Sequence, residues 1–201
     1  MSAGTTAPPA GADASPLAAT ATRLRITEVF LSLQGETIRT GLPTVFVRLT
    51  GCPLRCRWCD SAYAFSGGVF RELPELVREV QGYGVRQVCV TGGEPLAQAG
   101  CLALLKALCD AGLAVSLETS GAIDATAVDV RVARVFDLKA PGSGECARNH
   151  WPNFATLNPH DAVKFVLADR ADYDWARGVL AERQLHEVCE VLLSPVHGEL
   201  P

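Results

Sequence analysis

Three cysteines that lie close together give the clearest chemical signal in this sequence. Cys52, Cys56 and Cys59 have the spacing C-x3-C-x2-C. Structural zinc normally takes four ligands, but no fourth ligand lies close by and no histidine falls at a zinc-finger spacing. Three thiolates on a 4Fe–4S cluster leave one iron open to an external ligand, which suits a reaction centre. The spacing therefore favours a 4Fe–4S cluster, with a zinc site as the alternative.

The other five cysteines are spread singly along the chain. The N-terminal residues lack the basic start and continuous apolar stretch of a secretory signal. Scattered cysteines without such a signal fit a cytoplasmic protein with a metal or redox site better than a disulfide framework. Because buried free cysteine behaves as a small hydrophobe, we expect core positions for Cys89, Cys101, Cys109, Cys146 and Cys189.

Polar or glycine-rich residues follow most of the apolar runs that have the pattern of strands. Ligands bind at the carboxyl edge of parallel α/β sheets, so we expect these residues to form one site. The alternative is that they only form turns. The segments concerned are Gly51-Cys52, Thr91-Gly92-Gly93-Glu94, Glu118-Thr119-Ser120, Lys139 and Ser194-Pro195.

Strand-like runs alternate with helical ones along most of the chain, which implies βαβ units and a parallel sheet. Six strands, from residues 44–49 to residues 187–193, are too few for a closed eight-stranded barrel. The expected fold class is α/β, an open partial (β/α)6 barrel of mainly parallel strands. The predicted strands are 26–33, 44–49, 87–90, 113–117, 132–138, 162–167 and 187–193, and the predicted helices are 74–81, 102–111 and 171–184.

Length and charge narrow the class of protein further. A chain of 201 residues with 48% hydrophobic content suits one domain, which we place at residues 24–201 after a disordered extension at residues 1–23. The net charge of −4 gives no basic surface for nucleic acid or an anionic membrane. No apolar run approaches the roughly 18 residues that cross a bilayer. We therefore expect a soluble, cytoplasmic protein with a small-molecule ligand.

Two motifs together resemble the radical S-adenosylmethionine (SAM) superfamily. The cysteine loop follows an early strand and has Trp58 before its last cysteine, and Thr91-Gly92-Gly93-Glu94-Pro95 resembles the glycine-rich motif of that superfamily. The resemblance implies that SAM binds the open iron and that an electron from a reductant such as flavodoxin cleaves it to a 5′-deoxyadenosyl radical. It also implies that Gly93 and Trp58 contact the cofactor.

A longer stretch resembles one family within that superfamily, the 7-carboxy-7-deazaguanine synthases. The likeness is carried by Ser32-Leu33-Gln34-Gly35-Glu36-Thr37 and by residues 41–52. Members of this family convert 6-carboxy-5,6,7,8-tetrahydropterin to 7-carboxy-7-deazaguanine and ammonia on the route to queuosine. They need SAM and Mg²⁺ and are typically homodimers. The resemblance implies the same reaction, cofactors and assembly for this chain.

The family resemblance also assigns roles to individual residues. It implies substrate contacts for Leu33, Gln34, Gly35, Arg48 and Thr91. It places Glu118, Lys139 and Ser194 around the SAM and substrate cavity, and gives Ser61 to Mg²⁺, with waters and the substrate carboxylate completing the octahedron. Simpler alternatives stay open, because residues 34–36 could form a turn, Arg48 could anchor the sheet, and Glu118 could bond backbone amides.

Two features differ from the family pattern. Thr37 stands where the family often has glycine, so we expect an altered turn there. Family members usually continue past the position of Pro201 with a segment that closes the substrate pocket, so we expect a less complete pocket in this chain. The alternative functions are a glycyl-radical-enzyme activase of the same superfamily and, in another class, a non-catalytic zinc-binding module.

Overall fold

The structure is a computed structural model that describes residues 23–199. The disordered extension predicted for residues 1–23 lies outside this part of the chain, except for Arg23, with which the first strand begins. Among the described residues, no helix is both long enough and apolar enough to cross a membrane.

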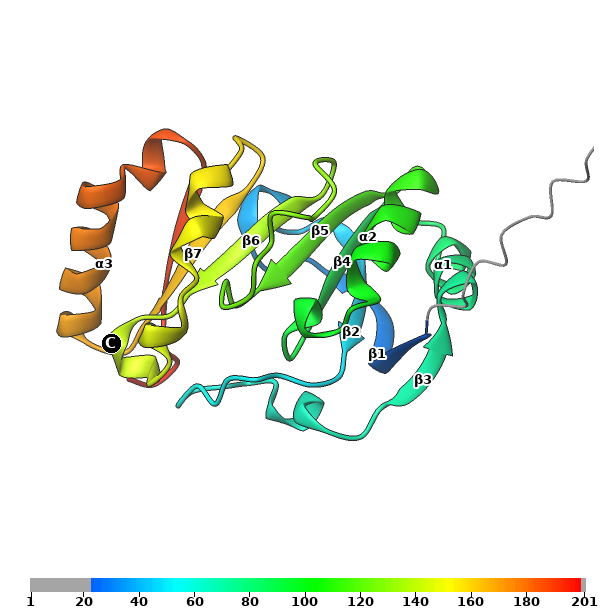
Figure 1. The fold of residues 1–201 in the computed structure, drawn as a ribbon, viewed down its shortest axis with the longest axis horizontal. Coiled ribbons are helices and arrows are strands. Elements are labelled where there is room, and N and C mark those ends of the chain that lie inside the picture. The colour runs from blue at the N-terminus through cyan, green and yellow to red at the C-terminus, as the bar shows by residue number, and fades with distance from the viewer. Residues whose placement is uncertain (1–22, 200–201) are drawn as a thin grey trace, which may run out of the picture.

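Eight strands in the described part of the chain form one open sheet, in the order β3-β1-β2-β4-β5-β6-β7-β8 (Figure 1). The pairs from β2 to β8 are parallel, whereas β1 runs antiparallel to β2 and β3. The predicted open sheet with six parallel strands is confirmed. The strands are β1 (Arg23–Leu33), β2 (Pro43–Leu49), β3 (Val69–Glu72), β4 (Gln87–Gly92), β5 (Ala114–Thr119), β6 (Ala133–Leu138), β7 (Ala162–Leu167) and β8 (Glu190–Pro195).

Three α-helices in the same residues pack against one face of the sheet (Figure 1). They are α1 (Leu73–Gly82), α2 (Cys101–Asp110) and α3 (Arg170–Arg183). Each presents apolar residues at helical spacing, such as Leu104 and Leu108 of α2, to the strands beneath it. Asp169 caps α3 by accepting a hydrogen bond from the Asp172 backbone N–H at 2.9 Å. The opposite face, which we call the inner face, is left for the site.

The crossovers differ from a regular (β/α)6 pattern. Helices connect β2 to β4, β4 to β5 and β7 to β8, but β5–β6 and β6–β7 are joined by turns and short 3-10 segments. Pro141 and Pro152 interrupt the second of these connections. Instead of a helix, the buried side chain of Asn153 holds these two connections together. Its amide forms hydrogen bonds of 2.9–3.2 Å with the backbone of Gly121, Ile123 and Ala125.

The loop between β1 and β2, residues 34–42, lies across the inner face, and we call it the floor loop. Its contacts reach distant strands: Arg39 Nη1 donates to the Ala114 carbonyl at 3.4 Å, and the Ile38 N–H donates to Glu190 Oε2 at 3.2 Å. The predicted difference at Thr37 has a structural counterpart, because Thr37 has a φ of 65°. Glycine adopts that left-handed conformation readily, whereas a β-branched residue does so at a cost.

Predicted core positions hold for three of the scattered cysteines. Cys89, Cys101 and Cys109 are buried, whereas Cys146 and Cys189 are only partly buried. The latter two lie in the short segment after β6 and just before β8, near the surface. The expectation of a core position was wrong for Cys146, whereas Cys189 is partly buried and packs against the core.

Candidate active site

A cavity of about 720 Å³ opens on the inner face, at the carboxyl ends of the parallel strands. The polar segments that follow β2, β4, β5, β6 and β8 all contribute to its wall. The structure thus brings together most of the candidate site residues. Those that line the cavity are Arg48, Cys52, Cys56, Trp58, Cys59, Ser61, Thr91, Gly93, Glu118, Lys139 and Ser194.

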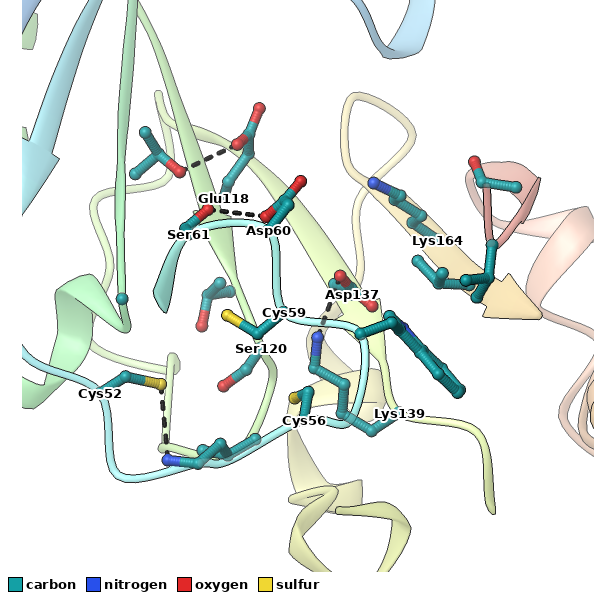
Figure 2. A pocket seen from close by; sticks show the side chains of 18 of the residues that line it. Cys52, Cys56, Cys59, Asp60, Ser61, Glu118, Ser120, Asp137, Lys139 and Lys164 are labelled. Atoms are coloured by element: carbon teal, nitrogen blue, oxygen red, sulfur yellow. Dashed lines mark hydrogen bonds and ion pairs between the residues drawn. The ribbon is translucent and has the colours of Figure 1, made fainter. Parts of the chain in front are cut away.

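The three motif cysteines enter the cavity from the loop after β2 (Figure 2). Hydrogen bonds from backbone N–H groups stabilise this loop. The Leu54 N–H donates to Cys52 Sγ at 3.4 Å, and the Arg57 N–H donates to the Ser143 carbonyl at 3.0 Å. Burial raises the pKa of the Cys52 and Cys56 thiols above the ordinary value. Binding to iron requires the thiolate, so cluster loading must release these protons.

The arrangement of these thiols fits a cluster. Within residues 23–199, no three His, Cys, Asp or Glu side chains converge tightly enough to hold a single metal ion. In an iron–sulfur cluster each thiolate binds a different iron, so three thiols that face one cavity from a single loop are suitable ligands. Soft thiolates are also the ligands that such clusters select.

The glycine-rich turn after β4 packs directly on the cysteine loop. A Cβ at Gly93 would lie 2.3 Å from the Gly51 carbonyl oxygen, so only glycine fits there. Glu94, which is fully buried, then ties this turn to the end of β5. Its carboxylate accepts hydrogen bonds from Leu96 N–H at 3.0 Å, Thr119 Oγ1 at 2.9 Å and Ser120 N–H at 2.8 Å.

Charged side chains of β5, β6 and β7 form a row on the inner face, and each has its own partner. Glu118 accepts a hydrogen bond from Thr91 Oγ1 at 2.9 Å, and Asp137 pairs with Lys139 Nζ at 3.0 Å (Figure 2). Lys164 pairs with Glu36 of the floor loop. Sequence reasoning missed Glu36, Asp137 and Lys164. A charged residue inside a mostly apolar strand is the signal that could have found Lys164 and Asp137.

Both lysines of this row stay protonated. Burial lowers the pKa of Lys139, but its ion pair with Asp137, and the negative charge that Cys56 and Cys52 carry when they are deprotonated, outweigh burial and leave this pKa above the ordinary value. Burial likewise lowers the pKa of Lys164, and Asp137, Glu36 and Glu118 outweigh it. The cavity therefore presents two fixed cations, which suits anionic groups of a ligand.

Arg48 and Ser61 both line the cavity, and each has a different partner. The Arg48 Nε donates to Glu28 Oε1 at 2.7 Å, and its side chain is only 16% exposed. Ser61 Oγ donates to Asp60 Oδ1 at 2.7 Å, which leaves the hydroxyl oxygen available to accept or to bind a cation (Figure 2). Hydroxyl and carboxylate oxygens are hard ligands of the kind Mg²⁺ prefers.

Three candidate residues are not brought to the cavity wall. Leu33 is 63% exposed at the end of β1, and Gly35 is exposed in the floor loop. Gln34 is buried, but its Oε1 accepts from the backbone N–H groups of Gly35 and Glu36 at 2.9 and 3.3 Å. That side chain shapes the floor loop, and Glu36 is the residue of this segment that reaches the cavity. Their substrate contacts stay predictions.

Comparisons with known proteins agree on one family. The model of the radical SAM superfamily matches residues 46–137. The 7-carboxy-7-deazaguanine synthase of Chlorobaculum tepidum is 42% identical over 88% of this chain and 82% of its own length, and that of Koribacter versatilis is 43% identical over 86% and 77%. Among solved structures, QueE from Escherichia coli matches with a TM-score of 0.68 at 22% identity, over 87% of this chain and 85% of its own.

Proposed function

The chain belongs to the 7-carboxy-7-deazaguanine synthase family of radical SAM enzymes, and from that premise we propose that it converts 6-carboxy-5,6,7,8-tetrahydropterin to 7-carboxy-7-deazaguanine and ammonia. The product would serve queuosine or a related deazapurine. Membership of this family decides against the two alternatives considered above, a glycyl-radical-enzyme activase and a zinc-binding module.

One observation supports this function more than any other. The cysteine loop, the glycine-rich turn and Arg48 come from β2 and β4, and they meet Glu118, Lys139 and Ser194 from later strands around a single cavity. A cluster ligand set, a SAM-binding turn and a carboxylate-binding arginine within one cavity are what the reaction needs. Turn formation alone would not gather fixed charges of both signs on one wall.

The cofactor side of the cavity would be held by the cysteine loop and its neighbours. Cys52, Cys56 and Cys59 would ligate the 4Fe–4S cluster, which together with bound SAM supplies radical hydrogen abstraction. The Gly93 backbone, packed against Gly51, would approach the SAM amino group closely. Trp58, Glu118, Lys139 and Ser194 would complete the SAM side, with the Lys139 ammonium suited to a carboxylate.

The substrate side would be formed by neighbouring residues of the cavity wall and by the floor loop. Arg48 would bind the pterin carboxylate and Thr91 would contact the ring, while Leu33, Gln34 and Gly35 would act through the conformation of the floor loop. Ser61 would supply one oxygen to Mg²⁺, beside the charge of Asp60. Arg48 would orient the substrate carboxylate, and Mg²⁺ held by Ser61 would supply a second positive charge to the cavity.

The partners follow from the same chemistry. A one-electron reductant such as flavodoxin would reduce the cluster, and the family resemblance supports a homodimer in the cytoplasm. Neither assignment depends on the geometry of the cavity.

Anaerobic reconstitution followed by assay with the carboxypterin tests the function directly. We expect 7-carboxy-7-deazaguanine and ammonia to form only when SAM, a reductant and the carboxypterin are all present. The matched control is tetrahydropterin without the 6-carboxylate, which should give no deazapurine. A reconstituted protein that cleaves SAM but forms no 7-carboxy-7-deazaguanine would contradict the proposal.

A further inference from the structure

The guanidinium of Arg48 is held from behind by one carboxylate. Its Nε donates to Glu28 Oε1 at 2.7 Å. Within residues 23–199, neither Nη atom of Arg48 has a hydrogen-bond partner, and the side chain lines the cavity. The two Nη atoms form the edge of a guanidinium that binds a carboxylate through parallel hydrogen bonds. Arg48 is therefore oriented with one edge occupied and the binding edge free.

Glu28 faces Arg48 because of a β-bulge in β1. Ile26 pairs with Leu49 and Glu28 pairs with Arg48, so two steps along β1 match one step along β2. Regular alternation would have put Glu28 on the same side as buried Ile26, beneath the helices. Bulges next to active sites re-aim side chains in this way. The irregularity in β1 thus delivers a carboxylate to the inner face at the position of Arg48.

A tyrosine from another segment fixes the same carboxylate. Tyr63, in the 3-10 segment Ala62–Phe65, donates its hydroxyl to Glu28 Oε1 at 2.7 Å. Its ring lies 5.7 Å from Arg48 Cζ, and the ring of Phe30 lies 5.9 Å away. The Tyr63 hydrogen bond lowers the pKa of Glu28, burial opposes it, and Arg48 lowers it further, so Glu28 is ionised at neutral pH.

We propose that Glu28 and Tyr63 are positioning residues that orient Arg48 toward the carboxylate of the substrate. The inference rests on the proposed function, which supplies a substrate with that group. Neither Glu28 nor Tyr63 lines the cavity, so they act through Arg48. A guanidinium already held in one orientation loses less side-chain entropy when the ligand binds.

Binding of oxidised 6-carboxypterin, a stable probe, tests the role without turnover. We expect Glu28→Ala to raise the calorimetric Kd of the reconstituted protein by about 10–100-fold, as for other misplaced binding groups. Glu28→Gln keeps an acceptor oxygen and should lose less, and Tyr63→Phe should lose less than Glu28→Ala. Pterin without the carboxylate should bind the parent and Glu28→Ala equally.

A double-mutant cycle separates positioning from general stability. If Glu28 acts through Arg48, adding Glu28→Ala to Arg48→Gln should change the Kd by less than about 2-fold. Glu72→Ala is the matched control. Glu72 lies on β3 and forms an ion pair of 3.2 Å with Arg23 of β1, and neither residue lines the cavity. Its Kd and iron content should equal those of the parent.

The outcomes distinguish this inference from the proposed function. Fully additive losses in the double variant, or an unchanged Kd in both Glu28→Gln and Tyr63→Phe, would overturn the positioning role. These two milder variants keep the test valid if Glu28→Ala does not fold. A parent protein that binds carboxypterin without forming product would contradict the function alone. A parent that does not bind carboxypterin would contradict both.

Discussion

The motif cysteines differ from the other cysteines in their surroundings. Cys52, Cys56 and Cys59 are half-buried at the cavity wall, whereas Cys101 is fully buried in α2. Burial raises the pKa of Cys101 to about 12, so its thiol is almost entirely protonated at neutral pH. Only the thiolate binds iron, so a buried cysteine such as Cys101 is a poor ligand. The residue type is the same in both groups, and only the spacing of the motif cysteines identified them in the sequence.

We expect Cys56→Ala to abolish the 4Fe–4S cluster, and Cys52→Ala and Cys59→Ala to do the same. Each change removes a thiolate that faces the cavity. Iron content and the visible absorption of anaerobically reconstituted protein measure the loss. Cys101→Ala is the control and should keep its iron, since its side chain packs only in the core. A full cluster in the Cys56→Ala protein would contradict the ligand assignment.

Ser61→Ala should raise the Mg²⁺ concentration required for turnover by about 10–100-fold, the usual effect of losing one ligand or its support. The hydroxyl already has its proton bonded to Asp60, so its oxygen is free for a cation. Turnover titrated with Mg²⁺ gives the measurement, and calorimetry should show near-normal SAM binding. Ser66→Ala, at an exposed serine of the same loop, should leave the Mg²⁺ response unchanged. An unchanged response in Ser61→Ala would exclude this serine from the site.

At the scale of elements, one buried carboxylate joins the turn after β4 to the end of β5. Glu94→Ala would leave the N–H groups of Leu96 and Ser120 without an acceptor. We expect the free energy of unfolding to fall by about 2–4 kcal/mol, as measured by urea denaturation. Glu75→Ala, at a 52% exposed ion pair on α1, should cost less than about 1 kcal/mol. Equal losses in both variants would show that Glu94 does not join the two strand ends.

The floor loop carries local backbone strain at Thr37, whose φ is 65°. Asparagine tolerates this left-handed conformation better than a β-branched residue and keeps a side-chain oxygen for the Arg39 N–H. We expect Thr37→Asn to raise the free energy of unfolding by about 1 kcal/mol. Thermal unfolding gives the comparison, with Thr40→Asn as control because Thr40 has a negative φ of −50°. A lower melting temperature for Thr37→Asn would mean that this loop is not strained.

Sequence patterns predicted the central strands well and the connections poorly. The strands at residues 44–49 and 162–167 are apolar runs that end in polar residues, so their limits were nearly right. The short edge strand β3 was missed, because four residues beside Gly67 and Gly68 carry little periodic signal. The bulge in β1 was also missed. It depends on pairing with β2, which local sequence does not report.

The candidate site was predictable to a similar degree. Motif residues at the carboxyl ends of the parallel strands reached the cavity, because these ends share one edge of the sheet. Residues 33–35 lie at and just after the end of the antiparallel strand β1 and did not reach it. Glu36 and Lys164 were missed, because their pairing requires the floor loop to meet β7 across the inner face. Such contacts between distant segments follow from the sheet as a whole.

At the scale of the whole molecule, the cavity is lined by residues from most of the parallel strands. A ligand bound there stabilises the folded state without binding the unfolded one. We expect SAM at about 100 times its Kd to raise the melting temperature of the reconstituted protein by roughly 5–10 °C. Cys56→Ala should show no such shift, since it would lack the iron that holds SAM. Equal shifts in both proteins would mean that SAM binds independently of the cluster.

The floor loop has a consequence for how the protein is made. Glu36 and its partner Lys164 are separated by 128 residues, and Ile38 and Glu190 by 152. At about 5–20 residues per second, the ribosome takes roughly 6–25 seconds to travel from the first residue of the closer pair to its partner. For most of that interval the nascent chain already has its cysteine loop, but it has no complete β7 or β8 to pack against the floor loop. The cavity around the motif cysteines is therefore complete only after the last two strands have been made.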